Sequence, residues 1–139
     1  MFIQLTDTVS VAPQLDPAQL AEAAAQGFVA VVNNRPDGEA ADQPTDETMR
    51  AAAAAAGLHY ASIPIDQSGF SMAQVDAMVA VLDAGGKVLA FCRSGTRSTN
   101  LWALAEAKRG GDPEAIVAAA AGGRYDVSGL LPTMRKLAP

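Results

Sequence analysis

Short apolar runs recur along the chain at intervals that suit an alternation of strands and helices. The run at residues 28–32 is apolar at every position, which is typical of a strand buried on both faces of a sheet. Residues 88–91 have the same character, and residues 9–12 and 59–65 are weaker versions of it. These four segments are the predicted strands.

Helix start and stop signals separate the apolar runs. Asp16 followed by Pro17 marks a helix N-terminus, and Gly27 marks the end of that helix. Ser71 and Gln74 have the spacing of a capping box before a helix over residues 72–84. Further helices are predicted from Thr45 to Gly57, over residues 99–108, after the Asp112-Pro113 pair, and over residues 131–137.

Strands that alternate with helices predict βαβ units, and therefore a mainly parallel sheet with helices on both faces. We expect one three-layer α/β domain over residues 1–139, because no linker, second domain or repeat is visible. Ligands of such folds bind beyond the carboxyl ends of the strands. Three loops are expected at that edge, at residues 33–38, 66–69 and 92–97.

Composition narrows the classes of function. The net charge of −5 and the pI of about 4.6, without a basic stripe, argue against nucleic-acid binding. A single cysteine excludes an internal disulfide and suits a reducing compartment, so we expect a cytoplasmic protein. The sequence has neither a secretion signal nor an apolar stretch near the roughly 20 residues of a membrane span. No cofactor, metal or membrane contact is expected.

The most informative segment is the loop that contains the only cysteine. Cys92 follows the apolar run at residues 88–91 and precedes a predicted helix, where backbone N–H groups and the helix dipole stabilise negative charge. Such surroundings favour the thiolate, which is the nucleophilic form of cysteine. We expect Arg93 to add positive charge and Arg97 to hold an oxyanion with two N–H groups. Four further residues are predicted to complete an anion-binding cup, Gly95 through its backbone and Ser94, Thr96 and Ser98 through their hydroxyls.

An inert buried thiol is the alternative interpretation of Cys92, because free cysteine is among the most buried residue types. The polar sequence that follows it, Arg-Ser-Gly-Thr-Arg-Ser, argues against a place in the core. Two covalent reactions then fit the loop. The sulfur could hold a sulfane sulfur as a persulfide, or it could attack phosphorus and hold a phosphoryl group.

Residues on the neighbouring loops are candidates for the same site. Arg35 could bind an anionic substrate and Asn34 could tie its loop to the cysteine loop, although a surface charge and a turn residue are equally good interpretations. Asp66 follows the predicted strand that comes before the cysteine strand, and it could protonate a leaving oxygen. The interpretation of Asp66 as a turn residue is favoured over that role.

The segment Cys-Arg-Ser-Gly-Thr-Arg-Ser at residues 92–98 resembles the active-site loop of single-domain rhodaneses, which are thiol sulfurtransferases. Those loops place four residues between the cysteine and, often, an arginine. Cysteine-dependent phosphatases carry His-Cys, five residues and then arginine. Here Phe91 replaces the histidine and Arg97 arrives one residue early. A shorter loop makes a tighter cup, which favours a sulfur atom over a tetrahedral phosphate.

Three segments, residues 31–39, 52–64 and 91–102, together resemble one family closely and in order. It is the bacterial phosphatase-like domain of the β-lactamase hydrolase-like proteins, found alone or fused to metallo-β-lactamase-type hydrolases. The resemblance covers almost the whole chain and implies a fold like that of the tyrosine and dual-specificity phosphatases. It leaves the activity open, because such domains are described both as phosphatases and as sulfurtransferases linked to sulfide detoxification.

The loop length makes sulfur transfer the leading hypothesis, with Cys92 carrying a sulfane sulfur from thiosulfate or a persulfide to a thiol or cyanide. The alternative is a cysteine phosphatase with Cys92 as nucleophile, Arg97 as phosphate clamp and Asp66 as acid. A third hypothesis is a non-catalytic anion-binding or redox-sensing module. The expected partners are a small anionic sulfur donor or phosphoester and, as the family resemblance implies, a metallo-β-lactamase-type hydrolase or a persulfide-handling enzyme.

Overall fold

Five strands form one sheet in the order β1-β2-β5-β3-β4 in the computed structural model, which describes residues 1–139. β1 runs antiparallel to β2, and all other neighbouring strands are parallel. The prediction of a mainly parallel α/β sheet is therefore confirmed, whereas β1 was missed because two residues carry too little pattern. The strands are β1 (Ile3–Gln4), β2 (Val9–Ala12), β3 (Phe28–Asn33), β4 (His59–Ser62) and β5 (Lys87–Phe91).

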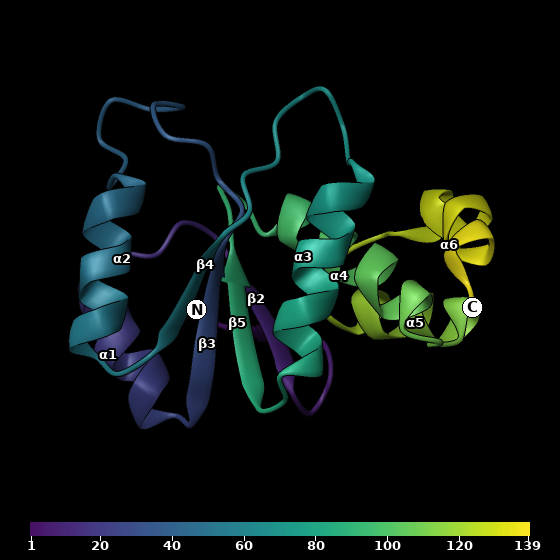
Figure 1. Ribbon diagram of the computed structural model, residues 1–139, viewed down its shortest axis with the longest axis horizontal. Coiled ribbons are helices and arrows are strands. Elements are labelled where there is room, and N and C mark those ends of the chain that lie inside the picture. Colours follow the sequence, from purple (N-terminus) through teal and green to yellow (C-terminus); the bar gives the residue numbers. More distant parts are fainter.

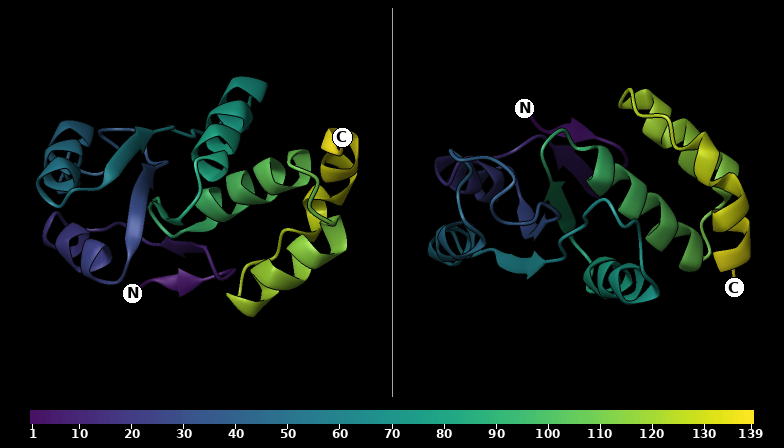
Figure 2. Two further views of the ribbon diagram at one scale, coloured as in Figure 1. Left: turned by 60° about the horizontal axis from the view of Figure 1, so that its bottom comes forward. Right: turned by 90° about the horizontal axis from the view of Figure 1, so that it is seen from above.

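Helices cover both faces of this sheet (Figure 1). On one face lie α1 (Ala18–Ala25) and α2 (Asp46–Ala55), and on the other lie α3 (Met72–Asp83) and α4 (Thr96–Lys108). Figure 2 shows α5 (Pro113–Gly122) and α6 (Leu131–Leu137) on the outer side of α4, joined through the short 3-10 helix η1 (Ser128–Leu130). None of the helices combines the length and apolarity that crossing a bilayer requires.

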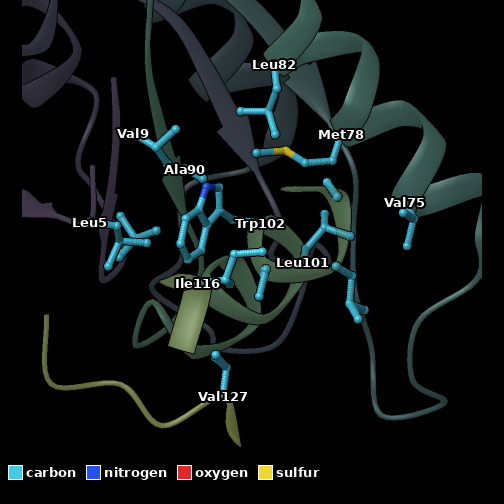
Figure 3. Packing of buried hydrophobic residues seen from close by; sticks show 14 of the residues in the cluster. Leu5, Val9, Val75, Met78, Leu82, Ala90, Leu101, Trp102, Ile116 and Val127 are labelled. Carbon is cyan, nitrogen blue, oxygen red and sulfur yellow. The ribbon is translucent and has the colours of Figure 1, made fainter. Parts of the chain in front are cut away.

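The larger hydrophobic core lies between the sheet and the layer of α3 and α4, and it fixes α4 firmly. Trp102 and Leu101 of α4 are buried against Met78 of α3 and Ile116 of α5 (Figure 3). Each buried aliphatic or thioether side chain contributes about 1.5–3 kcal/mol relative to exposure. Trp102, predicted as core, is confirmed there. The position of α4 matters because the cysteine loop ends at its first residue.

The predicted caps account for most helix starts. Ser71 and Gln74 form both bonds of the capping box, and Thr45 and Asp112 each accept a backbone N–H at the start of α2 and α5. The Asp16 side chain accepts the N–H of Gln19, as expected of a cap, although the regular helix α1 begins only at Ala18. Local polar spacing therefore defines where these helices begin.

Two predicted boundaries and one prediction of burial were wrong. β4 ends at Ser62 and not at residue 65, although the N–H groups of Ile63 and Ile65 still donate to the carbonyls of Asn33 and Asn34 beyond the regular strand. Val29 of β3 is 40% exposed, since that end of the strand borders an open apolar pocket. α4 begins at Thr96 and not at residue 99, because Gly95 adopts φ 87° and turns the chain directly into the helix. The first turn of α4 therefore includes Arg97.

Candidate active site

The cysteine loop follows the central strand of the sheet, and both flanking strands hold it. The Cys92 N–H donates to the carbonyl of Ala12 at the end of β2 (3.4 Å). On the other side, the Asn34 N–H just after β3 donates to the carbonyl of Phe91 (2.9 Å). The loops after β3 and β4 rise at the same edge of the sheet (Figure 1). The edge predicted from the parallel topology is thus where the candidate residues meet.

Cys92 lies at the bottom of this loop. Its side chain is fully buried, and its Sγ accepts the backbone N–H of Gly95 at 3.1 Å. One amide of the predicted anion nest therefore points at the sulfur. Cys92 is therefore fully buried, contrary to the expectation that the polar sequence after it keeps it out of the core, and the predicted shallow cup is wrong in this respect. The polar side chains of Arg93, Ser94 and Thr96 point to solvent, whereas the side chain of Cys92 points into the interior.

Arg97 is held by three hydrogen bonds in the first turn of α4. Its two terminal nitrogens donate to the carboxylate of Glu39, at 2.8 and 2.9 Å, and Nη1 also donates to the carbonyl of Ile65 at 2.8 Å. Three of the five N–H groups of the guanidinium are thus occupied. The remaining two, on Nε and Nη2, share the side edge of the group and suit a bidentate grip on an oxyanion.

Hydrogen bonding to Glu39, and then the nearby Cys92 sulfur, hold the pKa of Arg97 above its ordinary value. The bonds from Arg97, assisted by Arg35, hold the pKa of Glu39 below its ordinary value despite partial burial. The pair is therefore charged at neutral pH. The guanidinium of Arg97 does bond to a carboxylate with two nitrogens, but that carboxylate is Glu39 of the protein, and its grip on a bound oxyanion stays a prediction.

Glu39 was not predicted as a site residue. It follows the turn-rich loop after β3, and it bridges Arg97 and Arg35, whose Nε donates to Glu39 Oε1 at 3.0 Å. Its position directly after a loop at the ligand edge was the available signal. Two nearby arginines in a domain of net negative charge also call for a carboxylate partner.

Arg35 is not the surface charge that one interpretation of the sequence suggested, while its role as a substrate ligand stays a prediction. Only 6% of the residue is exposed, and its guanidinium bonds to Glu39 and to Oε1 of Gln14 (3.1 Å). A buried arginine needs such partners because an unpaired charge there is costly. Arg35 therefore orients Glu39, which in turn orients Arg97.

Asn34 joins the loop after β3 to the start of α4. It is fully buried, its Nδ2 donates to the carbonyl of Ile63 (2.9 Å), and its Oδ1 accepts the hydroxyl of Ser98 (2.8 Å). The suggested tie between the two loops is therefore present. Ser98, however, is also fully buried, and its hydroxyl donates its hydrogen bond to Asn34 Oδ1 and not to a bound anion as predicted.

The remaining loop hydroxyls lie away from the sulfur. Ser94 and Thr96 are exposed, and their hydroxyls bond to each other at 3.0 Å. Arg93 is exposed as well and has no ion-pair partner. Two members of the predicted cup, the backbone of Gly95 and the side chain of Arg97, lie near the sulfur. The side chains of Ser94 and Thr96 face outward.

Asp66 has the surroundings of a turn residue. It is exposed, and its Oδ1 accepts both the N–H (2.8 Å) and the hydroxyl of Ser68. These two bonds, the hydroxyl's first, hold the pKa of Asp66 below its ordinary value. Asp66 is therefore ionised at neutral pH and has no proton to give to a leaving group.

A pocket of about 470 Å³ opens at this edge of the sheet. Its walls contain charges of both signs and no apolar side chain, being formed by Glu39, Asp66, Gln67, Arg93 and Arg97. Cys92 does not reach the pocket wall. No group of three or more His, Cys, Asp or Glu side chains is arranged to hold a metal ion.

Comparison with solved structures defines the class of fold. A candidate phosphatase from Neisseria meningitidis matches with a TM-score of 0.78, 24% identity and coverage of 97% of each chain. A kinase-associated phosphatase, solved with its catalytic-site cysteine replaced by serine, matches with a TM-score of 0.72 and 13% identity, over 97% of this chain and 90% of that one. At these identities the likeness shows the fold alone, which is that of the tyrosine and dual-specificity phosphatases.

The sequence profile of the β-lactamase hydrolase-like protein, phosphatase-like domain, matches residues 1–109, and the chain belongs to this family. A β-lactamase hydrolase-like protein of Agrobacterium fabrum is 35% identical over 109 residues, which are 78% of this chain. The match spans a quarter of that relative's length. The predicted family is confirmed. The comparisons place the domain in a phosphatase-like family, and they support neither the rhodanese-like interpretation of the loop nor the sulfur transfer that was our leading hypothesis.

Proposed function

We propose that this domain is a cysteine-dependent phosphatase with Cys92 as its nucleophile. The observation that supports this most directly is the placement of Cys92 and Arg97 on either side of Gly95, at the start of α4, on a phosphatase-like fold. The Gly95 N–H stabilises a thiolate, and the free edge of the Arg97 guanidinium offers two donors to phosphate oxygens.

In the proposed reaction the Cys92 thiolate attacks phosphorus. The new S–P bond forms as the bond between phosphorus and the leaving oxygen breaks, and that oxygen departs with the electron pair. Arg97 stabilises the charge that spreads over the phosphoryl oxygens. Water then attacks the phosphocysteine, the S–P bond breaks, inorganic phosphate is released and the thiolate is restored.

The state of the nearby carboxylates limits the substrates. The pKa values of Asp66 and Glu39 are both lowered, so neither carries a proton at neutral pH. Ionised carboxylates at this edge favour a leaving group that is stable as an anion without general-acid help. The pocket also lacks an apolar wall for an aromatic ring. A small hydrophilic acyl phosphate, whose leaving group is a carboxylate, satisfies both conditions.

A second candidate, sulfur transfer, is favoured by the same two observations at the loop. Only four residues separate Cys92 from Arg97, and no protonated acid is at hand. Attack on the outer sulfur of thiosulfate expels sulfite with the electron pair and leaves a Cys92 persulfide. That step needs no proton, and an acceptor thiolate then removes the outer sulfur.

One set of assays separates the two candidates. Purified protein and a Cys92→Ser variant are given acetyl phosphate, p-nitrophenyl phosphate, or thiosulfate with cyanide, and released phosphate and thiocyanate are measured. We expect phosphate release that falls by roughly 10⁴-fold or more in the variant, with acetyl phosphate the best substrate. Thiocyanate without phosphate release would replace the phosphatase proposal with sulfur transfer, and neither product would overturn both.

A further inference from the structure

Tyr125 reaches the cysteine loop from a part of the chain outside the family match. It lies between α5 and η1, and its hydroxyl donates to the carbonyl of Ser94 at 2.8 Å. Its own N–H bonds to the carbonyl of Ala120 (2.9 Å). The preceding residue, Arg124, has φ 70°, the one positive value outside glycine in this chain. Such a conformation is uncommon in an L-residue, and here it aims the next side chain at the loop.

The carbonyl that Tyr125 holds belongs to the same peptide unit as the N–H that faces the sulfur. The Ser94 carbonyl and the Gly95 N–H point in opposite directions because the peptide is trans. The Tyr125 hydroxyl donates to the Ser94 carbonyl, and the Gly95 N–H donates to Cys92 Sγ at 3.1 Å. The orientation of this single peptide therefore decides whether the sulfur has its amide donor.

The backbone at Gly95 allows the opposite orientation as well. Its φ of 87° and ψ of −8° match the third residue of a type II turn. Rotating the preceding peptide by about 180° gives a type I turn, in which the N–H points away from the sulfur. An interaction is needed to favour the type II form over the type I form. The hydroxyl of Tyr125 supplies one, because it donates to the Ser94 carbonyl of the same peptide.

We propose that Tyr125 is a positioning residue that fixes the peptide between Ser94 and Gly95, and so keeps the Gly95 N–H on the Cys92 sulfur. The fit is close, because a Cβ added at Gly95 would lie 2.3 Å from the Tyr125 hydroxyl oxygen. Burial, and then the charge of Cys92, raise the pKa of Tyr125. Its hydroxyl therefore remains a donor throughout the neutral range.

The inference rests on the proposed role of Cys92 as a nucleophile, and Tyr125→Phe tests it. We would measure the rate of Cys92 alkylation by iodoacetamide against pH. The midpoint is expected to rise by about one pH unit, since one donor to the thiolate is lost. Phosphate release at neutral pH should fall by up to about tenfold in kcat/KM. Arg93 and Arg97, with Glu39 behind Arg97, are the charged groups around Cys92, and the variant leaves them unchanged.

Tyr60→Phe is the matched control, because it removes a half-buried hydroxyl that bonds to Asp46 and Asn33. Its alkylation profile should equal that of the wild type. An unchanged midpoint in Tyr125→Phe, with the Tyr60→Phe control normal, would overturn the inference. A wild-type thiol that resists alkylation at every pH would instead count against the proposed function.

A second measurement keeps the test independent of how well the variant folds. In the wild type, the amide proton shift of Gly95 should follow the titration of Cys92, because the N–H donates to the sulfur. In Tyr125→Phe that dependence should be reduced at least twofold. A Gly95 shift that is indifferent to Cys92 in the wild type would also overturn the inference.

Discussion

The two ends of the sheet differ in what they offer a ligand. At the amino ends of the strands lies a pocket of about 540 Å³, lined mostly by apolar residues such as Val29 and Val81. At the carboxyl ends the pocket is smaller, about 470 Å³, and entirely polar. The larger pocket is lined by no cysteine, arginine or lysine, and its polar side chains are those of His59 and Tyr60. The smaller one lies among Arg97, Glu39 and the buried links that hold them.

The candidate active site is thus distinguished by how its polar side chains are connected and not by the volume of its pocket. Near Cys92, polar side chains bond to one another in a continuous series from Gln14 through the buried Arg35 and the more exposed Glu39 to Arg97. Each member is costly to bury alone and is stable only with its neighbours. Such a network is a poor way to stabilise a fold, but it fixes a charged group in one orientation.

The largest expected effect comes from breaking the clamp. Arg97→Lys keeps one positive charge but loses the planar group that bonds to Glu39 and grips phosphate with two donors. We expect kcat/KM for acetyl phosphate to fall by roughly 10²–10³-fold. Steady-state kinetics beside Arg93→Lys would check this. Activity close to the wild type in Arg97→Lys would show that positive charge alone, without the planar two-donor group, suffices at position 97.

The next largest effect concerns the tie between the loop after β3 and α4. Asn34→Ala leaves the Ile63 carbonyl and the Ser98 hydroxyl unpaired in the interior. Unfolding free energy should fall by about 1–3 kcal/mol, measured by urea titration. Asn100→Ala on α4 is the control, since that half-buried side chain makes no hydrogen bond. Similar stabilities of the two variants would contradict a structural role for Asn34.

Glu39→Gln should have a smaller effect, with a pH signature. The wild-type pair stabilises the fold fully above the ordinary Glu39 pKa of 4.5, and this contribution is lost as pH falls through the lowered folded pKa. The variant should lack that part of the acid-induced loss of melting temperature. At pH 7 we expect KM for acetyl phosphate to change by about tenfold or less. If the melting temperatures of the wild type and Glu39→Gln fell by the same amount as the pH is lowered, the stabilising role of the charged Glu39 would be refuted.

The smallest effect is expected at the opposite end of the sheet. Val29→Thr places a hydroxyl on the exposed, apolar-lined side of β3, where threonine also suits a strand. Phosphate release should stay within about twofold of the wild type. A tenfold loss would show that the amino-end pocket communicates with the cysteine loop, and the contrast between the two ends would then fail.

Much of the fold could be predicted because it depends on short-range rules. The capping box of Ser71 and Gln74 and the apolar run of β3 are legible within a few residues, and parallel topology then places three loops at one edge. Cys92 and Arg97 were found for the same reason. Their roles depend on a strand end, a glycine turn and a helix start that are adjacent in sequence.

The rest of the site depends on contacts that no local pattern records. Glu39 meets Arg97 across 58 residues, and Tyr125 meets Ser94 across 31. Ser98 was assigned to the wrong side because α4 starts earlier than predicted. Consecutive helical residues point about 100° apart, so Arg97 faces the sulfur while Ser98 turns into the interior toward Asn34.

The early start of α4 has a consequence for protein engineering. Arg97 takes its direction from the buried face of the helix, through Ser98 and Trp102, whereas Cys92 takes its position from the end of β5. The two reacting groups are thus anchored on different elements, and the loop between them only spans the gap. One residue inserted after Gly95 would widen the cup to the spacing of ordinary cysteine phosphatases while leaving both anchors in place. The number of residues between Cys92 and Arg97 could therefore be changed by engineering without moving the elements that hold either residue.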